Sequence, residues 1–153
     1  MNLFVVSDIH GHLTHFEEML THWNREDILV VLGDLIDRGP QSLQVIEKVI
    51  ELNQTYGDKV VFLKGNHEDM FVHAARAIRN ILIEQDRDVL EWCNERGIQD
   101  LIYGAYYNDD VALHLNNGGF YTLYEWLADG ASMTIVNAID KLPTCVEFVN
   151  NNG

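Results

Sequence analysis

Residues 28–39 read Ile-Leu-Val-Val-Leu-Gly-Asp-Leu-Ile-Asp-Arg-Gly, an apolar run of strand length followed by a glycine and a cluster of charged side chains. Two further apolar runs, at residues 3–6 and 60–63, have a similar length and are also rich in valine. Runs without polar alternation are typical of strands buried on both faces, as in a parallel sheet. The three runs therefore predict three parallel strands.

Between these runs, apolar residues recur at the spacing of an amphipathic helix. Leu13, Phe16 and Leu20 mark this period in the first segment, and Leu43 and Ile46 begin it in the second. The resulting order is β-α-β-α-β, which requires right-handed crossovers and places ligands outside the carboxyl ends of the strands. The predicted fold class is α/β.

The rest of the chain is predicted to be mainly helical. Two helices are expected between residues 68 and 97, another at 120–126 and another at 132–141, with a turn at Asn116-Asn117-Gly118-Gly119. Residues 145–149 alternate like a strand, and the Asn-Gly pair that closes the sequence is a hairpin signal without a following partner strand. We expect one domain over residues 1–153 that lacks its C-terminal strands and contains a helical insertion at residues 68–142.

Composition excludes several classes of function. The chain has 153 residues, and 24 acidic against 10 basic side chains give a formal charge of −14. Such a protein repels a polyanion, so nucleic acid is not an expected partner. Two cysteines, Cys93 and Cys145, form neither a disulfide framework nor a zinc motif. The sequence contains no signal peptide and no apolar run of about 18 residues, which predicts a cytoplasmic protein without a membrane partner.

Each predicted strand is followed by a polar cluster, namely Asp8-Ile9-His10-Gly11-His12, residues 33–39 and Gly65-Asn66-His67-Glu68. The carboxyl ends of parallel strands meet at one edge, so Asp8, His10, Asp34 and Asn66 are expected to face one crevice. Asp-x-His on an extended strand end would point both side chains to the same side. Each cluster alone is common loop chemistry, but three together predict a metal pocket suited to manganese, iron or zinc.

These motifs, Asp8-x-His10-Gly11, Gly33-Asp34-x-x-Asp37-Arg38-Gly39 and Gly65-Asn66-His67-Glu68, resemble those of the calcineurin-like metallophosphoesterases. Within that superfamily the chain is most similar to the phosphoprotein phosphatase branch, in particular the small bacterial and phage serine/threonine phosphatases of the bacteriophage lambda type. The resemblance implies half of a metallophosphoesterase sandwich, two divalent ions, most plausibly Mn²⁺ with Fe, Zn or Ni as alternatives, and attack by a hydroxide that bridges them.

The resemblance also implies a role for each matching residue. Asp8 and His10 would hold one metal, Asp34 would bridge both, and Asn66 would hold the second and contact the substrate phosphate. His67 would act as general acid, with Asp37 holding its imidazole, and Arg38 would bind the phosphoryl oxygens. A carboxylate beside an imidazole favours its protonated form, and the planar guanidinium suits a phosphate.

The family supplies two more histidines to the second metal, from later segments of the chain. Five histidines remain beyond His10 and His67 and all precede the last predicted strand: His12, His15, His22, His73 and His114. His12 is left unassigned, and the other four are expected to be solvated or packed rather than ligands. The first metal site is thus predicted to be complete and the second half present. Glu68 is expected either to support the site by a hydrogen bond or simply to begin a helix.

The expected function is hydrolysis of phosphate monoesters, in particular phosphoserine and phosphothreonine in proteins. A symmetrical dinucleoside-tetraphosphate hydrolase shares these motifs, and the pair of Asp37 and His67 favours the protein phosphatase because an alkoxide leaving group needs a proton. A metal-binding or phosphoprotein-binding module without turnover is the alternative from another class. The metal stoichiometry separates them, with two ions per chain for the enzyme and one for the binder.

Overall fold

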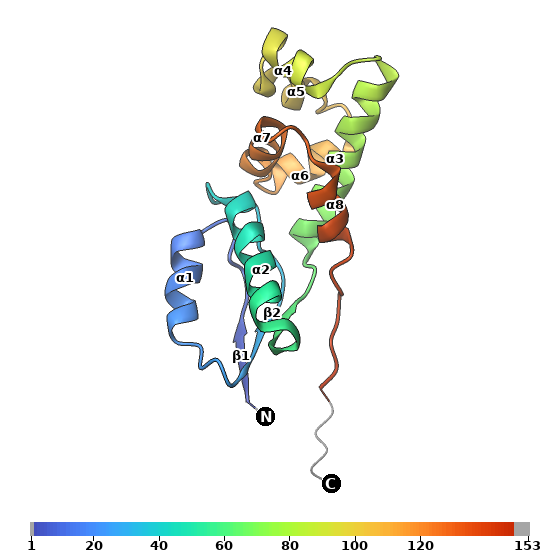
Figure 1. Ribbon diagram of the computed structural model, residues 1–153. Coiled ribbons are helices and arrows are strands. Elements are labelled where there is room, and N and C mark those ends of the chain that lie inside the picture. The colour runs from blue at the N-terminus through green and yellow to red at the C-terminus, as the bar shows by residue number, and fades with distance from the viewer. Residues whose placement is uncertain (1, 149–153) are drawn as a thin grey trace.

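A computed structural model describes residues 2–148 of the chain (Figure 1). Its sheet has three strands, β1 (Leu3–Val6), β2 (Ile28–Val31) and β3 (Val60–Phe62). All are parallel and lie in the order β1-β2-β3. The strands and their order confirm the predicted β-α-β-α-β unit and the α/β class.

Helices α1 (Leu13–Thr21) and α2 (Ser42–Tyr56) connect the strands, and a short 3-10 turn, η1 (Gly57–Lys59), leads into β3. Phe16 and Leu20 of α1 and Val49 of α2 are buried in the same core as the side chains of one sheet face. That face is defined by the strand register and consists of Phe4, Val6, Leu29, Val31, Val60 and Phe62. The periodic apolar residues of both helices are therefore buried against the sheet, as their spacing predicts.

The opposite face of the sheet is only partly covered, which corrects the expectation of burial on both faces. Leu3 and Val5 of β1 are 42% and 49% exposed. In a sheet of order β1-β2-β3, two right-handed crossovers place both helices on the same face. Leu3 and Val5 are therefore apolar side chains of β1 that the described residues leave largely uncovered.

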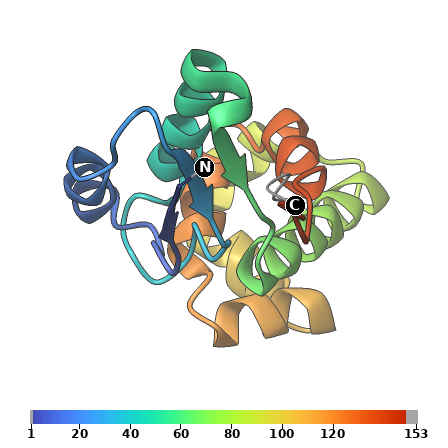
Figure 2. The same ribbon diagram turned by 90° about the horizontal axis from the view of Figure 1, so that it is seen from below.

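Six helices follow β3, from residue 66 to residue 140. They are α3 (Asn66–Glu84), α4 (Val89–Arg96), α5 (Ile98–Gly104), α6 (Asp109–Asn116), α7 (Phe120–Ala128) and α8 (Met133–Asp140). Figure 1 shows α4 to α7 stacked beyond the carboxyl ends of the strands, with α3 running from the sheet into this layer. In Figure 2 the strands are seen nearly end-on, with helices around them. That this helical layer is an insertion at residues 68–142 stays a prediction.

The expected strand at residues 145–149 is wrong for the part that the structure describes, because residues 145–148 have no regular structure. This segment follows Pro143, whose carbonyl accepts a hydrogen bond from the Lys64 backbone N–H at 2.7 Å. Alternating side chains form a strand only where a neighbouring strand supplies the ladder of hydrogen bonds. Val149 and the predicted turn at residues 151–153 lie outside the described residues.

A single cluster of buried apolar side chains joins the sheet to the helical layer. It includes Leu29 and Phe62 from the strands, Phe71 and Ile78 from α3, and Trp126 from α7. This continuous core fixes the helices over the strand ends. No helix within residues 2–148 is long and apolar enough to cross a membrane.

Candidate active site

The loops that follow β1 and β2 have an unusual backbone. Asp8, His10, Asp34, Asp37 and Arg38 all have positive φ angles, between 47° and 73°. Side chains other than glycine rarely adopt this conformation, which costs about 1 kcal/mol or more per residue. Five residues of the predicted site share it, so the folded structure holds the backbone of the site under strain. Such strain is characteristic of functional loops.

The backbone of the first loop corrects one step of the sequence argument. β1 ends at Val6, and Asp8 and His10 are left-handed rather than extended, so the alternation of a strand does not bring them together. Their side chains nevertheless meet, with 3.7 Å between Asp8 Oδ1 and His10 Nε2. The loop is held by hydrogen bonds from the N–H groups of His10 and Gly11 to the carbonyls of Asp34 and Leu35.

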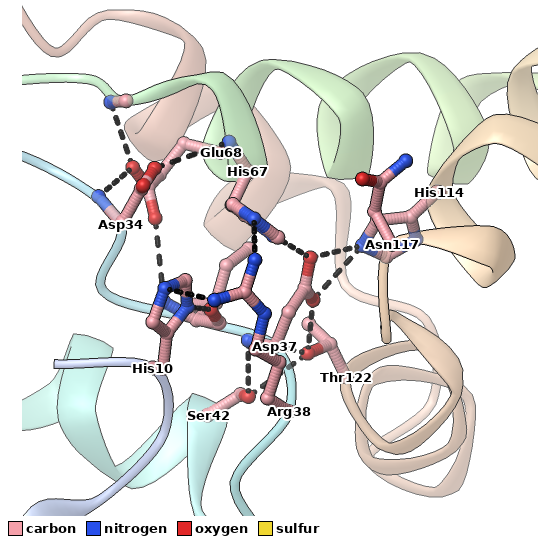
Figure 3. Close-up of polar contacts among 12 residues, drawn as sticks. His10, Asp34, Asp37, Arg38, Ser42, His67, Glu68, His114, Asn117 and Thr122 are labelled. Atoms are coloured by element: carbon pink, nitrogen blue, oxygen red, sulfur yellow. Dashed lines mark hydrogen bonds and ion pairs between the residues drawn. The ribbon is translucent and has the colours of Figure 1, made fainter. Parts of the chain in front are cut away.

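Glu68 fastens the second loop to the start of α3 (Figure 3). Its carboxylate accepts hydrogen bonds from the backbone N–H groups of Asp34, Leu35 and Ile36, and also from Gly65, which precedes the helix. Burial raises the pKa of Glu68 above its ordinary value, while these four N–H groups oppose the rise. Both sequence interpretations of Glu68 therefore hold, since it lies in the first turn of α3 and supports the loop of Asp34.

The hydrogen bonds of His10 prepare its other ring nitrogen for a metal. Nδ1 lies 3.0 Å from the Ile36 carbonyl, which accepts only, so Nδ1 carries the proton and Nε2 presents a lone pair. A backbone carbonyl that fixes the tautomer in this way is the usual support of a metal-binding histidine. The sequence predicts His10 as a ligand, and its geometry is compatible with that role.

The donor set fits a divalent metal. Ligand atoms of His10, Asp34 and His67 all lie within 4.8 Å of one another. Two atoms that are each about 2.1 Å from one ion are at most about 4.2 Å apart, so the 3.7 Å between Asp8 and His10 suits a shared ion. Imidazole and carboxylate donors suit manganese, iron or zinc. Asn66, the remaining predicted ligand, is the first residue of α3 and is exposed.

Arg38 lies between the two imidazoles of the site. Its guanidinium donates to His10 Nε2 at 2.9 Å and to His67 Nε2 at 3.1 Å, so it uses the lone pair that a metal on His10 would need (Figure 3). The sequence predicts instead that Arg38 binds phosphoryl oxygens. Because Arg38 is exposed and its side chain is long, it can leave the imidazoles when a metal and an anion arrive.

On the other side of Arg38, Asp37 is fully buried and accepts several hydrogen bonds (Figure 3). His67 Nδ1 lies 2.8 Å from Oδ2, which brings together the predicted acid and its predicted partner. His114 Nε2 lies 2.9 Å from both carboxylate oxygens, and the Thr122 hydroxyl donates to Oδ1 at 2.6 Å. Burial by itself would raise the pKa of Asp37, but the hydrogen bonds from His114, Thr122 and His67 outweigh it and lower that pKa.

Sequence reasoning missed three residues of this arrangement, His114, Thr122 and Ser42. His114 was expected to be packed or solvated, and it is indeed fully buried, but against a carboxylate of the site. Ser42 Oγ accepts from the Asp37 backbone N–H at 3.0 Å and lies 2.8 Å from Thr122 Oγ1. No local motif marks His114 and Thr122, because more than 75 positions separate them from Asp37 in the chain.

The other histidines lie outside this cluster of possible ligands within residues 2–148. His12 precedes α1 and its ring is 5.6 Å from that of His15, His22 follows the same helix, and His73 is exposed on α3 near Asp69. No ligand role is assigned to His12. For His15, His22 and His73, a solvated or packed role stays the prediction.

Comparisons with known proteins identify the family of the chain. The family profile described as calcineurin-like phosphoesterase matches residues 1–148, and the chain belongs to that family. Its relatives include proteins named symmetrical bis(5'-nucleosyl)-tetraphosphatase. The protein from Acidovorax ebreus is 39% identical over 60% of this chain, and the one from Hamiltonella defensa is 26% identical over 82%. Serine/threonine-protein phosphatase 2 of Escherichia coli is 40% identical over 48% of this chain.

The chain spans only part of these relatives. The matched region is 36% of the Acidovorax protein, 46% of the Hamiltonella protein and 32% of the Escherichia coli phosphatase. The resemblance to calcineurin-like metallophosphoesterases that the sequence motifs indicate is confirmed.

Proposed function

We propose that this site hydrolyses phosphate monoesters, with phosphoserine and phosphothreonine in proteins as the substrate class. The observation that carries the proposal is the buried hydrogen bond of 2.8 Å between Asp37 and His67. A serine or threonine alkoxide is a poor leaving group and needs a proton as the ester bond breaks. The Asp37 carboxylate accepts the Nδ1 proton and orients the ring, so that Nε2, the atom that faces the centre of the site, would deliver the proton to the leaving oxygen.

The other residues would bind the metals and the phosphate. Asp8, His10, Asp34 and Asn66 are the proposed ligands for two divalent ions, with manganese as the expected metal. When bound, the ions supply a nucleophile at neutral pH and neutralise charge on the phosphate. Arg38, released from His10 and His67, would bind the phosphoryl oxygens with its planar fork. His67 Nε2, freed of the same contact, would then face the leaving oxygen.

Cleavage of a dinucleoside tetraphosphate is the second candidate, and the names of several relatives favour it. That reaction releases a nucleoside diphosphate, which leaves readily without a proton because its charge is spread over phosphate oxygens. It has less need of the pair of Asp37 and His67. The two candidates therefore differ in how strongly they depend on Asp37.

A direct comparison of two substrates tests the proposal. The 153-residue chain and its Asp37→Asn variant are assayed with Mn²⁺ on a phosphoserine peptide and on diadenosine tetraphosphate. We expect cleavage of the peptide, and a loss of about 10²-fold or more in the variant, the usual contribution of a general acid. Cleavage of the tetraphosphate alone, with no loss in the variant, would overturn the monoester assignment in favour of the second candidate.

Failure to cleave either substrate would overturn the proposal for this chain and leave the non-catalytic binding module. The stoichiometry of Mn²⁺ binding then identifies that module, because one ion per chain is expected for it and two for the enzyme. Measuring the stoichiometry with Asp34→Asn in parallel ties the bound metal to this site rather than to the acidic surface.

A further inference from the structure

The helical layer contributes directly to the site through one buried imidazole. His114 lies on α6 and is fully buried, and its Nε2 contacts both oxygens of Asp37 at 2.9 Å. Asp37 thus accepts from two histidines, one on the face of the proposed reaction and one behind it. The proposed chemistry uses only the first of them, His67.

The protonation state of His114 follows from its surroundings. A carboxylate only accepts, so Nε2 must carry a proton. Nδ1 is buried and has no hydrogen-bond partner among the described residues. His114 therefore contacts the Asp37 carboxylate through Nε2 alone. Of the three side chains on Asp37, His114 alone contacts both oxygens, whereas His67 contacts Oδ2 and Thr122 contacts Oδ1.

The glycine turn after α6 fits around this arrangement. A side chain at Gly119 would overlap the imidazole of His114, so only glycine leaves room for the ring in its present place. The neighbouring Gly118 carbonyl accepts a hydrogen bond of 3.0 Å from the backbone N–H of Arg38. The Asn-Asn-Gly-Gly turn at residues 116–119 therefore has a structural reason: it seats His114 and joins the helical layer to the Arg38 loop.

We infer that His114 is a positioning residue of the site: it fixes the orientation of the Asp37 carboxylate and, through it, the ring of His67. This inference rests on the proposed function for its catalytic consequence, but the geometric claim stands on the contacts alone. A carboxylate held at both oxygens cannot rotate about its Cβ–Cγ bond. With His114 absent, Thr122 is the one side chain that holds the carboxylate independently of His67, and it holds Oδ1 alone. Oδ2 and the His67 ring that contacts it can then shift together.

The test compares two substitutions of His114 in the full chain with one control substitution elsewhere. Gln places an amide N–H close to the position of Nε2, Phe keeps the flat ring without a donor, and the exposed His73→Gln serves as the matched control. NMR of the imidazole protons reports whether the Nδ1 proton of His67 is held. We expect a slowly exchanging signal in the unaltered chain, His114→Gln and His73→Gln, and exchange at least about tenfold faster in His114→Phe.

Gly119→Ala is the second variant, and it keeps His114 but displaces its ring. It is expected to behave like His114→Phe, which covers the case in which His114→Phe fails to fold. Protection of the His67 proton that is unchanged in both variants would overturn the inference. Loss of protection in His114→Gln as severe as in His114→Phe would overturn it too, because the donor would then not matter.

Kinetics add a readout that a purely structural role would not produce. For a phosphoserine peptide, we expect His114→Phe to lower kcat about tenfold or more while KM stays within about twofold, with recovery in His114→Gln. For para-nitrophenyl phosphate, whose leaving group needs no proton, kcat should change much less. Equal losses on both substrates would contradict the positioning role. The NMR result does not require turnover, so the inference and the proposed function can fail independently.

Discussion

The two sides of the site are built in opposite ways. On the metal side, Asp8 is 65% exposed, and the Nε2 atom of His10 meets a removable guanidinium and, at 3.7 Å, a carboxylate. On the acid side, Asp37 is fully buried and every contact around it is a hydrogen bond of 2.6 to 3.2 Å. The proposed metal ligand His10 thus has a lone pair that a mobile guanidinium occupies, whereas the Asp37 carboxylate has buried partners at both oxygens.

The origin of the two sides differs as well. The metal side comes from the loops after β1 and β2 and from the start of α3, and its backbone is strained at Asp8, His10 and Asp34. The acid side combines Asp37 and His67 with His114 and Thr122 from the helical layer. The helices thus contribute side chains that contact Asp37 and do more than cover the strand ends.

The largest effect is expected on the metal side, from Asp34→Asn. Replacing one carboxylate oxygen by an amide nitrogen removes the proposed bridge, and metal-dependent turnover should fall at least about a thousandfold because bound metals supply several kcal/mol of stabilisation to the transition state. Phosphate release with Mn²⁺ measures it, and Asp58→Asn, an exposed site after α2, is the control. Turnover within tenfold of the unaltered chain would show that Asp34 holds no essential metal.

Glu68→Gln tests the hydrogen bonds by which Glu68 holds the Asp34 loop to the start of α3. The amide can accept at one oxygen only and presents its NH₂ to backbone N–H groups, so we expect a loss of about 2 to 3 kcal/mol in the free energy of unfolding. Urea denaturation measures the loss, with the exposed Glu47→Gln on α2 as the matched control. A loss below about 0.5 kcal/mol would mean that the four backbone hydrogen bonds contribute little.

The acid side predicts a pH dependence of stability. The pKa of Asp37 is lowered in the folded chain. The unfolded chain therefore binds more protons near pH 3.8, and the contribution of Asp37 is full above that pH and is lost as the pH falls through the folded pKa. We expect Asp37→Asn to cost about 2 kcal/mol at pH 7 and less at pH 3.

Denaturation of both proteins at the two pH values gives this difference directly. The comparison subtracts the other acidic groups, because both chains carry them unchanged. A difference that stays constant or grows toward pH 3 would contradict the lowered pKa of Asp37.

The smallest effect is expected from Arg38→Ala, on the affinity for metal. Arg38 donates to the same lone pair of His10 that a metal would take. Removing a hydrogen bond of about 1 kcal/mol should strengthen Mn²⁺ binding about fivefold. Titration calorimetry measures the change, with the exposed Arg79→Ala as control. Weaker binding in Arg38→Ala would show that the guanidinium does not compete with the metal.

Much of the fold could be predicted because its signals are local. The valine-rich runs and the period of Leu13, Phe16 and Leu20 depend on burial by near neighbours, and they give the correct strands and crossovers. The exposure of Leu3 and Val5 and the absence of a strand at residues 145–148 could not be predicted, because both depend on what lies beside the segment in space. An apolar pattern indicates which side chains favour burial, but it does not indicate whether another segment of the chain buries them.

The same distinction applies to the site. Asp34, Asp37 and His67 follow strands directly, so sequence position indicates them. Their backbone conformations do not follow from position, and the expected extended Asp-x-His geometry gives way to two left-handed residues. In the sequence, His114 stands between apolar residues of α6, and only Gly118 and Gly119 after it indicate that other atoms lie close to this turn.

We expect Asp8, His10 and Asp34 to bind divalent metal beside the pair of Asp37 and His67. Diffraction at the manganese absorption edge from crystals of the full chain grown with Mn²⁺ tests it most directly. We predict anomalous density in contact with these three residues, with Arg38 withdrawn from His10. Anomalous density only at acidic residues elsewhere on the surface would contradict this expectation. So would a complete absence of such density, with Arg38 still lying between the imidazoles of His10 and His67.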